Sequence, residues 1–339
     1  MKKGRVVYIE KPGKVSIKET EIKIESPYDV IVKMHRSSIC GTDKNYFEGL
    51  ERPENPMLGA TEIPKQRPLP MGHESCGIAV EVGEAASSIF KPGDPVMSFW
   101  WSNAFADYWK APVRADGFGA VPLPKGMTLD EAALGEPSAC AIYAGCASGV
   151  VPGDIVAVVG LGFAGQVISQ MAKVMGAKTV IGIDIVESKL KKAKELGIDM
   201  VFNAKETNVI SEIAKLTEKK GVDVAIESAG VSETLQLVTE IVRHGGIIGI
   251  YSWFLEEKVA VNISRWHDDG LNIRTLALAH QTSGHFNRKW WVERTLDILA
   301  SHTVKVEPLI SRHFSLEDAQ KAFEAATQDR DSIKVTLTP

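Results

Sequence analysis

Five side chains that could do chemistry gather in two short stretches of the N-terminal part. Cys40, Thr42 and Asp43 stand within four positions in "RSSICGTDKNYFEG", and His73 and Glu74 are adjacent in "PMGHESCGIAVEVGE". A catalytic zinc ion takes thiolate, imidazole and carboxylate donors from three residues and keeps a fourth position open. Cys40, His73 and a carboxylate are therefore a possible zinc site. Taken singly, a cysteine can equally be a packing residue, and a His-Glu pair a structural hydrogen bond.

A second candidate site is a glycine loop between an apolar, strand-like run and a helical segment. The stretch "VAVVGLGFAG" spaces Gly160, Gly162 and Gly165 as G-x-G-x-x-G. In this pattern the first glycine makes a tight turn, the second lets the backbone approach a pyrophosphate, and the third lets the helix pack on the strand. The helix N-terminus then faces the phosphates. The alternative is an unliganded turn on an ordinary α/β sheet.

The end of the following strand favours NAD over NADP. Asp184 lies nineteen positions after Gly165, where a carboxylate accepts hydrogen bonds from the ribose hydroxyls and repels a 2′-phosphate. The next residues, "IVES", offer no arginine, and Lys189 is the first cation available. We expect these residues to contact the cofactor: Gly160, Gly162, Phe163, Ala164, Gly165, Asp184, Lys189 and Ser228.

The elements that must position these residues differ between the two parts of the chain. Residues 5–40 mostly alternate polar and apolar side chains, which indicates short antiparallel strands. After Val150, strand-like and helical runs alternate, as a doubly wound parallel sheet requires. We expect an α/β protein with three segments: a β-rich, zinc-binding catalytic domain at 1–148, a Rossmann NAD-binding domain at 149–284, and a segment at 285–339 that returns to the catalytic domain.

The composition is that of an ordinary globular protein. At 339 residues the chain is longer than a single core usually grows, so two domains are expected. The net charge is −4, and the absence of long runs of like charge argues against nucleic acid or a membrane surface as partner. We find no signal-peptide pattern and no apolar stretch of membrane-spanning length. We therefore expect a cytoplasmic protein with reduced cysteines and a small-molecule substrate.

The motifs, taken in order, carry a family resemblance over nearly the whole chain. "CGTD", "GHESCGIAVEVG", "KPGDPV", "GEPSACAIYAG" and "GLGFAG" resemble motifs of the zinc-dependent medium-chain dehydrogenases of the alcohol dehydrogenase superfamily. The chain is most similar to the polyol (sorbitol) and threonine dehydrogenase branch, because Glu136 stands where other branches carry a zinc-binding cysteine. The resemblance implies a GroES-like catalytic domain and a homodimer or homotetramer.

The resemblance also implies roles for the candidate catalytic residues. It makes Cys40 and His73 zinc ligands. It makes Glu74 and Glu136 the carboxylates that bind the metal directly, exchange on it or hold its water, and the sequence does not rank these two. Thr42 is implied as the hydroxyl that takes the proton of the alcohol, because hydride transfer to a nicotinamide requires the proton to leave. Asp43 is expected to support the loop.

Two features depart from the family pattern. Asn45 stands where the branch commonly has a histidine, and an amide does not titrate near neutrality, so the outer proton relay is left open. The cysteine-rich lobe that many members use for a structural zinc is missing, so we expect one catalytic zinc ion per subunit and no structural zinc. The remaining cysteines are expected to be packing residues: Cys76, Cys140 and Cys146.

The resemblance places an aromatic run on the substrate side of the zinc. Phe99, Trp100 and Trp101 would narrow the pocket and exclude water, although they could also belong to a domain core. Cations that could hold a substrate carboxylate, cap helices or face solvent occur later in the chain: His280, His285 and Arg288.

These observations together predict an oxidoreductase that uses zinc and NAD. It would transfer a hydride between NAD(H) and a secondary alcohol or ketone of a polyol, sugar or sugar acid. A threonine-type amino alcohol dehydrogenase is one alternative, and its rate would depend on a substrate ammonium group. A nucleotide-binding protein that kept the fold and lost the chemistry is another, which only Asn45 favours.

Overall fold

A computed structural model of the protein describes residues 1–50, 67–99, 102–255, 258–278, 281 and 286–339. The chain divides into two compact units. The first comprises residues 1–139, 281–302 and 306–339, and the second comprises residues 140–280 and 303–305. The division falls inside helix α3 (Gly135–Ala147), shortly before the predicted boundary at residue 148.

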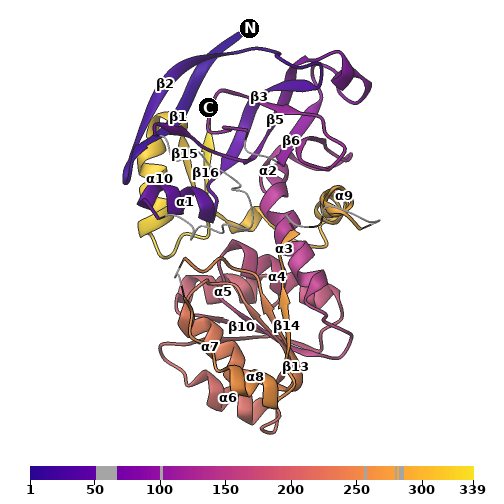
Figure 1. The fold of residues 1–339 in the computed structure, drawn as a ribbon, viewed down its shortest axis with the longest axis vertical. Coiled ribbons are helices and arrows are strands. Elements are labelled where there is room, and N and C mark those ends of the chain that lie inside the picture. Colours follow the sequence, from indigo (N-terminus) through magenta and orange to yellow (C-terminus); the bar gives the residue numbers. More distant parts are fainter. Residues whose placement is uncertain (51–66, 100–101, 256–257, 279–280, 282–285) are drawn as a thin grey trace. The chain divides into compact units, whose positions relative to one another are not determined.

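The first unit is built on two β-sheets. Strand β1 (Lys2–Lys11) pairs with β2 (Lys14–Ile22) and β4 (Leu69–Pro70) in a three-stranded antiparallel sheet. The second sheet has the order β15-β16-β3-β5-β6-β8, and β7 pairs with β3. Its strands are β3 (Asp29–Ser38), β5 (Glu74–Val82), β6 (Pro95–Phe99), β7 (Tyr108–Pro112), β8 (Gly119–Pro122), β15 (Ile310–Ser315) and β16 (Lys334–Thr338). In Figure 1 the yellow strands β15 and β16 lie beside the indigo β3, so the C-terminus completes a sheet begun near the N-terminus.

The first unit also contains helices, and the last of them along the chain packs against the first. The helices are α1 (Gly41–Glu48), α2 (Leu129–Ala132), α9 (Arg288–Ala300) and α10 (Ala319–Gln328), with short 3₁₀ turns at Ala85–Ser88, Glu307–Leu309 and Leu316–Asp318. Phe47 of α1 packs on Phe323 of α10 at 5.1 Å between ring centroids, and Phe105 meets Phe323 edge-on at 5.6 Å. These three buried rings fix α1 against the core, and the helix begins directly after Cys40.

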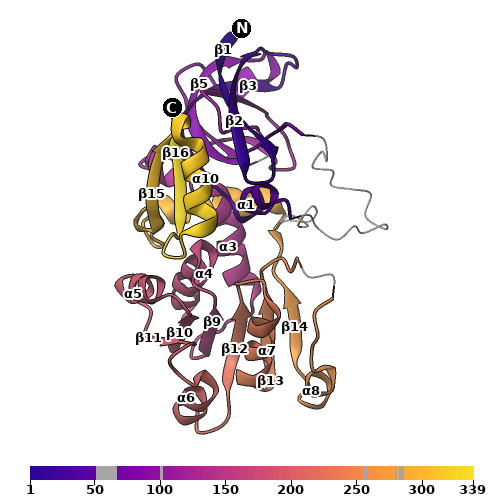
Figure 2. The same ribbon diagram turned by 90° about the vertical axis from the view of Figure 1, so that its left-hand side faces the viewer.

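The second unit is a six-stranded, fully parallel sheet. Its strand order, β11-β10-β9-β12-β13-β14, runs from left to right in Figure 2. The strands are β9 (Ile155–Val159), β10 (Thr179–Asp184), β11 (Met200–Asn203), β12 (Val222–Glu227), β13 (Val242–Ile250) and β14 (Asn272–Thr275). The central strand β9 is almost wholly buried and reads "IVAVV", the continuous apolar run expected of a strand covered on both faces.

Helices connect the parallel strands of the second unit. They are α4 (Phe163–Val174), α5 (Glu187–Glu195), α6 (Val209–Leu216), α7 (Ser232–Ile241) and α8 (Ile263–Asp268). Helices α4 and α5 pack against β9, β10 and β11, whereas α7 packs against β12 and β13 and contacts α6. Right-handed crossovers therefore place α4 and α5 on one face and α6 and α7 on the other. The predicted fold class, a doubly wound Rossmann sheet with a second, β-rich domain, is confirmed.

Candidate active site and metal centre

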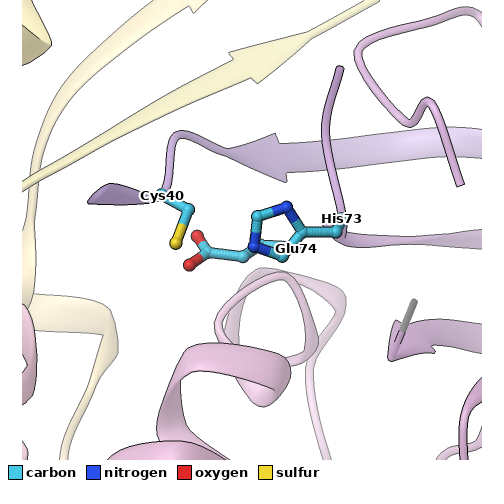
Figure 3. Close-up of side chains that lie close together, drawn as sticks. All are labelled: Cys40, His73 and Glu74. Atoms are coloured by element: carbon cyan, nitrogen blue, oxygen red, sulfur yellow. The ribbon is translucent and has the colours of Figure 1, made fainter. Parts of the chain in front are cut away.

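Three of the predicted ligand residues meet in the first unit. One donor atom from each of Cys40, His73 and Glu74 lies within 4.8 Å of the other two, and Figure 3 shows the sulfur and the carboxylate facing each other beside the imidazole ring. His73 and Glu74 are buried, and Cys40 is half-buried. Sulfur, nitrogen and oxygen donors at this spacing fit a zinc ion, which prefers this donor set.

Strand pairing explains why residues so far apart in sequence come together. The end of β3 runs antiparallel to the start of β5, and Ser38 is directly opposite Glu74. Cys40 follows β3 by two residues, and His73 immediately precedes β5. Gly72 makes this approach possible, because its φ is +103° and a Cβ there would lie 2.8 Å from the backbone nitrogen of Phe105.

Asp43 stabilises the segment that carries Cys40. Its Oδ2 accepts a hydrogen bond of 2.8 Å from the backbone N–H of Cys40, which caps α1. Its Oδ1 lies 3.8 Å from Nδ1 of His73. Burial raises the pKa of Asp43 to about 6, although His73 opposes the shift. Asp43 therefore connects two of the three candidate ligands, in addition to the loop support expected from the sequence.

The two carboxylate oxygens of Glu74 have different hydrogen-bond partners. Oε2 accepts hydrogen bonds from Nζ of Lys334, at 2.5 Å, and from the hydroxyl of Ser38. Oε1 is buried and accepts no hydrogen bond from any residue that the structure describes. A buried carboxylate oxygen without a hydrogen-bond donor is a favourable position for a cation. Glu74 therefore fits the metal on one side and is held by the protein on the other.

Glu136, the second candidate carboxylate, lies in the first turn of α3 and outside this donor group. It is half-buried, and burial raises its pKa to about 7. His73 lowers this pKa and Glu74 raises it, so Glu136 feels the charges of the centre electrostatically. The sequence could not rank the two glutamates, whereas the geometry brings Glu74, rather than Glu136, among the donors.

Burial and neighbouring charges shift the pKa values of both Cys40 and His73. Burial raises the pKa of the Cys40 thiol, Glu74 raises it further, and His73 lowers it. Burial works against the charged form of His73, but Cys40 and Asp43 raise the pKa of its imidazole well above the usual histidine value. The proton on His73 thus balances the negative groups around it. A divalent ion would take over this role.

Thr42 and Asn45 extend from the same helix, α1. The hydroxyl of Thr42 lies 3.8 Å from the Cys40 sulfur, and the side chain is half-buried. Asn45 follows within the same helix and is also half-buried. A hydroxyl so close to a candidate ligand can exchange a proton with a group bound at the centre.

In the second unit, the three glycines of the loop after β9 differ in the space that surrounds them. Gly160 has φ of +95°, and a Cβ there would lie 2.9 Å from the backbone nitrogen of Ala229. A Cβ on Gly165 would lie 1.9 Å from the carbonyl oxygen of Gly160, so only glycine allows α4 to pack this closely. A Cβ on Gly162 would meet nothing within 4 Å. The backbone at Gly162 is therefore open to a ligand at the N-terminus of α4.

Asp184 at the end of β10 stabilises this loop. Its Oδ2 accepts a hydrogen bond of 2.7 Å from the N–H of Leu161, and its Oδ1 accepts from the N–H groups of Ile185 and Val186. The side chain is half-buried, and it links the glycine loop to the start of α5. The other predicted cofactor residues lie on neighbouring segments: Phe163 and Ala164 in α4, Lys189 in α5, and Ser228 after β12.

Sequence comparison identifies the family. Residues 26–125 match the alcohol dehydrogenase GroES-like domain, and residues 164–288 match the zinc-binding dehydrogenase family. The sorbitol dehydrogenase of Mus musculus is 31% identical over 93% of this chain and 90% of its own. The chain belongs to the zinc-dependent medium-chain alcohol dehydrogenases. The sorbitol dehydrogenase of Bacillus subtilis, 29% identical over 94% of both chains, also places this dehydrogenase near the polyol branch, as predicted.

The solved structures agree with this assignment. A zinc-binding dehydrogenase from Sinorhizobium meliloti, determined with NADP bound, is 25% identical to this dehydrogenase, covers 100% of both chains and superposes with a TM-score of 0.84. This alcohol dehydrogenase is therefore an oxidoreductase that acts on the CH–OH group of a small molecule with zinc and a nicotinamide cofactor. Among its described residues, no helix is both long and apolar enough to cross a membrane.

The expected substrate pocket of the dehydrogenase is described only in part. Phe99 ends β6, is buried, and lies 5.9 Å from Phe118 between ring centroids. Trp100 and Trp101 lie outside the described residues, as do the late histidines at positions 280 and 285. Arg288 is buried, with its guanidinium 3.2 Å from the centre of the Phe118 ring. It packs inside the first unit, which gives no support to a role in holding a substrate carboxylate.

Two residues of this alcohol dehydrogenase were not predicted from the sequence. Lys334 reaches Glu74 from the C-terminal strand, 260 positions away in sequence. Glu227, at the end of β12, is fully buried, and its Oε1 accepts hydrogen bonds of 2.7 Å from the N–H groups of Ala229 and Gly230. It shapes the turn against which Gly160 packs. The glutamate that ends the strand run "VDVAIE", directly before a turn, could have marked this position.

The cysteines other than Cys40 take no part in the metal centre. The structure describes all four cysteines, and none of them forms a disulfide, as predicted. Cys76 is buried in the sheet, and its sulfur lies 2.8 Å from the carbonyl oxygen of Leu129. Cys140 and Cys146 are half-buried in α3, so they are less enclosed than Cys76.

Proposed function

We propose that this dehydrogenase interconverts a secondary alcohol and a ketone of a polyol, sugar or sugar acid, with NAD as the hydride acceptor. The observation that carries the proposal is the donor group of Cys40, His73 and Glu74, with the hydroxyl of Thr42 3.8 Å from the Cys40 sulfur. Similar proteins named sorbitol dehydrogenase and D-xylulose reductase, the latter from Saccharomyces cerevisiae at 26% identity, support a polyol substrate.

The proposed ligands are the three members of the donor group. Cys40 would bind as a thiolate and His73 as a neutral imidazole, and Glu74 would offer Oε1, the oxygen that accepts no hydrogen bond from the described residues. Asp43 accepts a hydrogen bond from the Cys40 backbone and places a carboxylate oxygen 3.8 Å from Nδ1 of His73, so it supports both ligands. We propose one zinc ion per subunit at this position and no structural zinc.

The residues around the metal divide the remaining tasks. When bound, the zinc ion supplies Lewis-acid polarisation of the alcohol oxygen, and the nicotinamide accepts the hydride. Thr42 accepts the proton of the substrate hydroxyl through its Oγ1. Asn45 can pass a hydrogen bond outward but cannot take the proton itself, so solvent must receive it. Glu136, with a pKa of about 7, can gain or lose a proton at neutral pH and buffers the charge of the site.

The cofactor preference follows from the end of β10. Asp184 places a carboxylate where a 2′-phosphate would lie, and the residues that follow it include no arginine. The loop from Gly160 to Gly165 and the N-terminus of α4 receive the pyrophosphate, and Lys189 is the nearest cation along the chain. These features support NAD. The similar structure with NADP bound makes the comparison of the two cofactors a necessary test.

The test measures NAD⁺ and NADP⁺ reduction on a panel of polyols, aldonic acids, uronic acids and amino alcohols. We expect turnover on a member of the polyol or sugar groups, with a higher kcat/KM for NAD⁺ than for NADP⁺. Turnover restricted to substrates with an ammonium group would instead support a threonine-type enzyme. NADP⁺ preference would overturn the assignment of Asp184.

We also propose that the enzyme is a homodimer or homotetramer. Strand β14 forms one edge of the parallel sheet, and its four residues are exposed. A further strand from a second copy could pair there. Light scattering during size-exclusion chromatography would measure the mass, and a monomer would contradict the proposal.

A further inference from the structure

Lys334 is the one buried lysine among the residues that the structure describes, with 5% of its side chain exposed. Its Nζ lies 2.5 Å from Oε2 of Glu74 and donates a hydrogen bond of 3.3 Å to the carbonyl oxygen of Ile39. Burial of an ammonium group is costly unless an opposite charge compensates it. The position of Lys334 therefore depends on Glu74.

The fold delivers this lysine to the metal centre by strand pairing. Strand β16 pairs antiparallel with the end of β3, with Thr336 opposite Ser38. The N–H of Ile39 also donates to the carbonyl oxygen of Val335 at 2.9 Å. Lys334 consequently begins the strand beside the segment that leads into Cys40. Backbone hydrogen bonds between strands therefore fix the position of Lys334, as they do for the residues beside the candidate ligands.

The contacts of Glu74 show what the lysine does there. Lys334 and Ser38 both donate to Oε2, and no described residue donates to Oε1. These two donors occupy both lone pairs of Oε2, so a carboxylate that bound a zinc ion through both oxygens would have to give up at least one of them. The ammonium of Lys334 thus favours the arrangement in which Glu74 offers one oxygen to the metal.

We propose that Lys334 is a positioning residue that competes with the metal for Glu74 and so keeps this carboxylate an exchangeable ligand. The inference rests on the proposed function, because it requires a metal ion beside Cys40 and His73. By limiting the hold of Glu74 on the metal, Lys334 leaves room for the substrate oxygen.

The substitution Lys334→Met separates this role from simple structural support. Without the ammonium group, Glu74 in the zinc-free protein loses the cation bound to its Oε2, whereas in the zinc-bound protein the metal can still neutralise the carboxylate. Loss of Lys334 should therefore destabilise the zinc-free form more than the zinc-bound form. By thermodynamic linkage, zinc then binds more tightly. Removal of a lysine that only supported the fold would leave zinc affinity unchanged or lower it.

The experiment compares wild type, Lys334→Met, Lys334→Arg and Lys110→Met. Lys110 is the matched control, since its Nζ also lies 2.5 Å from a carboxylate, that of Glu25, but at the surface. We would measure the rate of zinc loss to a chelator, the melting temperature with and without zinc, and the visible spectrum of the Co²⁺-substituted protein. Ser38→Ala, which removes the other donor to Oε2, is a second variant in case Lys334→Met does not fold.

We expect Lys334→Met to lose zinc more slowly by roughly 10- to 100-fold, the size typical of changes next to metal ligands. Its Co²⁺ spectrum should differ from wild type, and its turnover should fall. Lys334→Arg should resemble wild type, Lys110→Met should be indistinguishable from it, and Ser38→Ala should shift in the same direction as Lys334→Met by a smaller factor. Unchanged or faster zinc loss in Lys334→Met would overturn the inference and leave the proposed function standing. If Lys334→Met does not fold, the same result in Ser38→Ala would overturn it. A wild-type protein that binds neither zinc nor Co²⁺ would overturn both.

Discussion

Replacing the two glutamates one at a time tests which of them belongs to the metal centre. Glu74→Gln removes the negative partner of the buried Lys334 and one of the three candidate donors. Glu136→Gln changes a half-buried group whose pKa is about 7. Because burial raises this pKa to near neutrality, the protonated form of Glu136 is accessible at pH 7, and a glutamine resembles that form. The first substitution should be far more costly than the second.

The expected sizes follow from these surroundings. Removing one partner of a buried ion pair costs about 3–5 kcal/mol, and the amide oxygen of glutamine still accepts from Lys334, so we expect about 3 kcal/mol for Glu74→Gln in the zinc-free protein. For a domain of this size that is ~6–12 °C in melting temperature. Glu136→Gln should cost less than about 1 kcal/mol. Changes outside the ligand set already weaken metal binding by roughly 10–100-fold, so loss of the Glu74 donor should cost at least about 100-fold.

The assay measures zinc affinity by competition with a chromogenic chelator and the melting temperature of the zinc-free protein. Both variants are compared with wild type in the same buffer. A larger loss of zinc affinity in Glu136→Gln than in Glu74→Gln would refute the assignment of Glu74 as the third ligand. Equal melting temperatures for Glu74→Gln and wild type would contradict the buried ion pair.

Three further predictions concern the proton path, the cofactor loop and pH. Thr42→Val should lower kcat by roughly 100-fold or more while the zinc content is unchanged, because only the proton acceptor is lost. Gly162→Ala should leave the melting temperature unchanged and weaken NAD binding, since the added methyl group meets only the cofactor, whereas Gly165→Ala should weaken both. Zinc affinity should rise with pH, because burial raises the pKa of the Cys40 thiol and zinc binding must release its proton. Titration calorimetry in buffers of different ionisation enthalpy measures that release.

Each of these predictions has an outcome that contradicts it. Full activity of Thr42→Val would remove Thr42 from the proton path, and Thr42→Ser serves as the control that keeps the hydroxyl. Unchanged NAD affinity in Gly162→Ala would mean that the cofactor does not approach this backbone. Zinc affinity independent of pH would contradict the release of protons from Cys40 and His73, and with it their assignment as ligands.

The parts of the site that short motifs encode could be predicted from the sequence. Cys40 and His73 lie at strand ends, within motifs that the alternating strand pattern places in one sheet, and the donor group contains both. The period-two strands of the first unit and the alternating strands and helices of the second follow from local patterns of apolar residues. Both units have the architecture that those patterns indicate.

Contacts between distant segments could not be predicted in this way. Lys334 lies in an ordinary strand sequence, and only the pairing of β16 with β3 brings it to Glu74. The choice between Glu74 and Glu136 likewise depends on where α3 begins relative to β5, which spacing along the chain does not give. Arg288 looked available for a substrate, but packing of α9 buries it on Phe118. Tertiary packing, rather than local sequence, decides these positions.

The most direct test of a catalytic zinc at Cys40 is elemental analysis of protein purified without chelators, paired with NAD⁺ reduction on the same sample. The Cys40→Ser variant is analysed alongside the wild type. We predict about one zinc ion per wild-type chain together with turnover of a polyol or sugar substrate, and loss of both in Cys40→Ser. Wild-type protein that contains no zinc and shows no turnover, or a Cys40→Ser variant that keeps its zinc, would contradict the account.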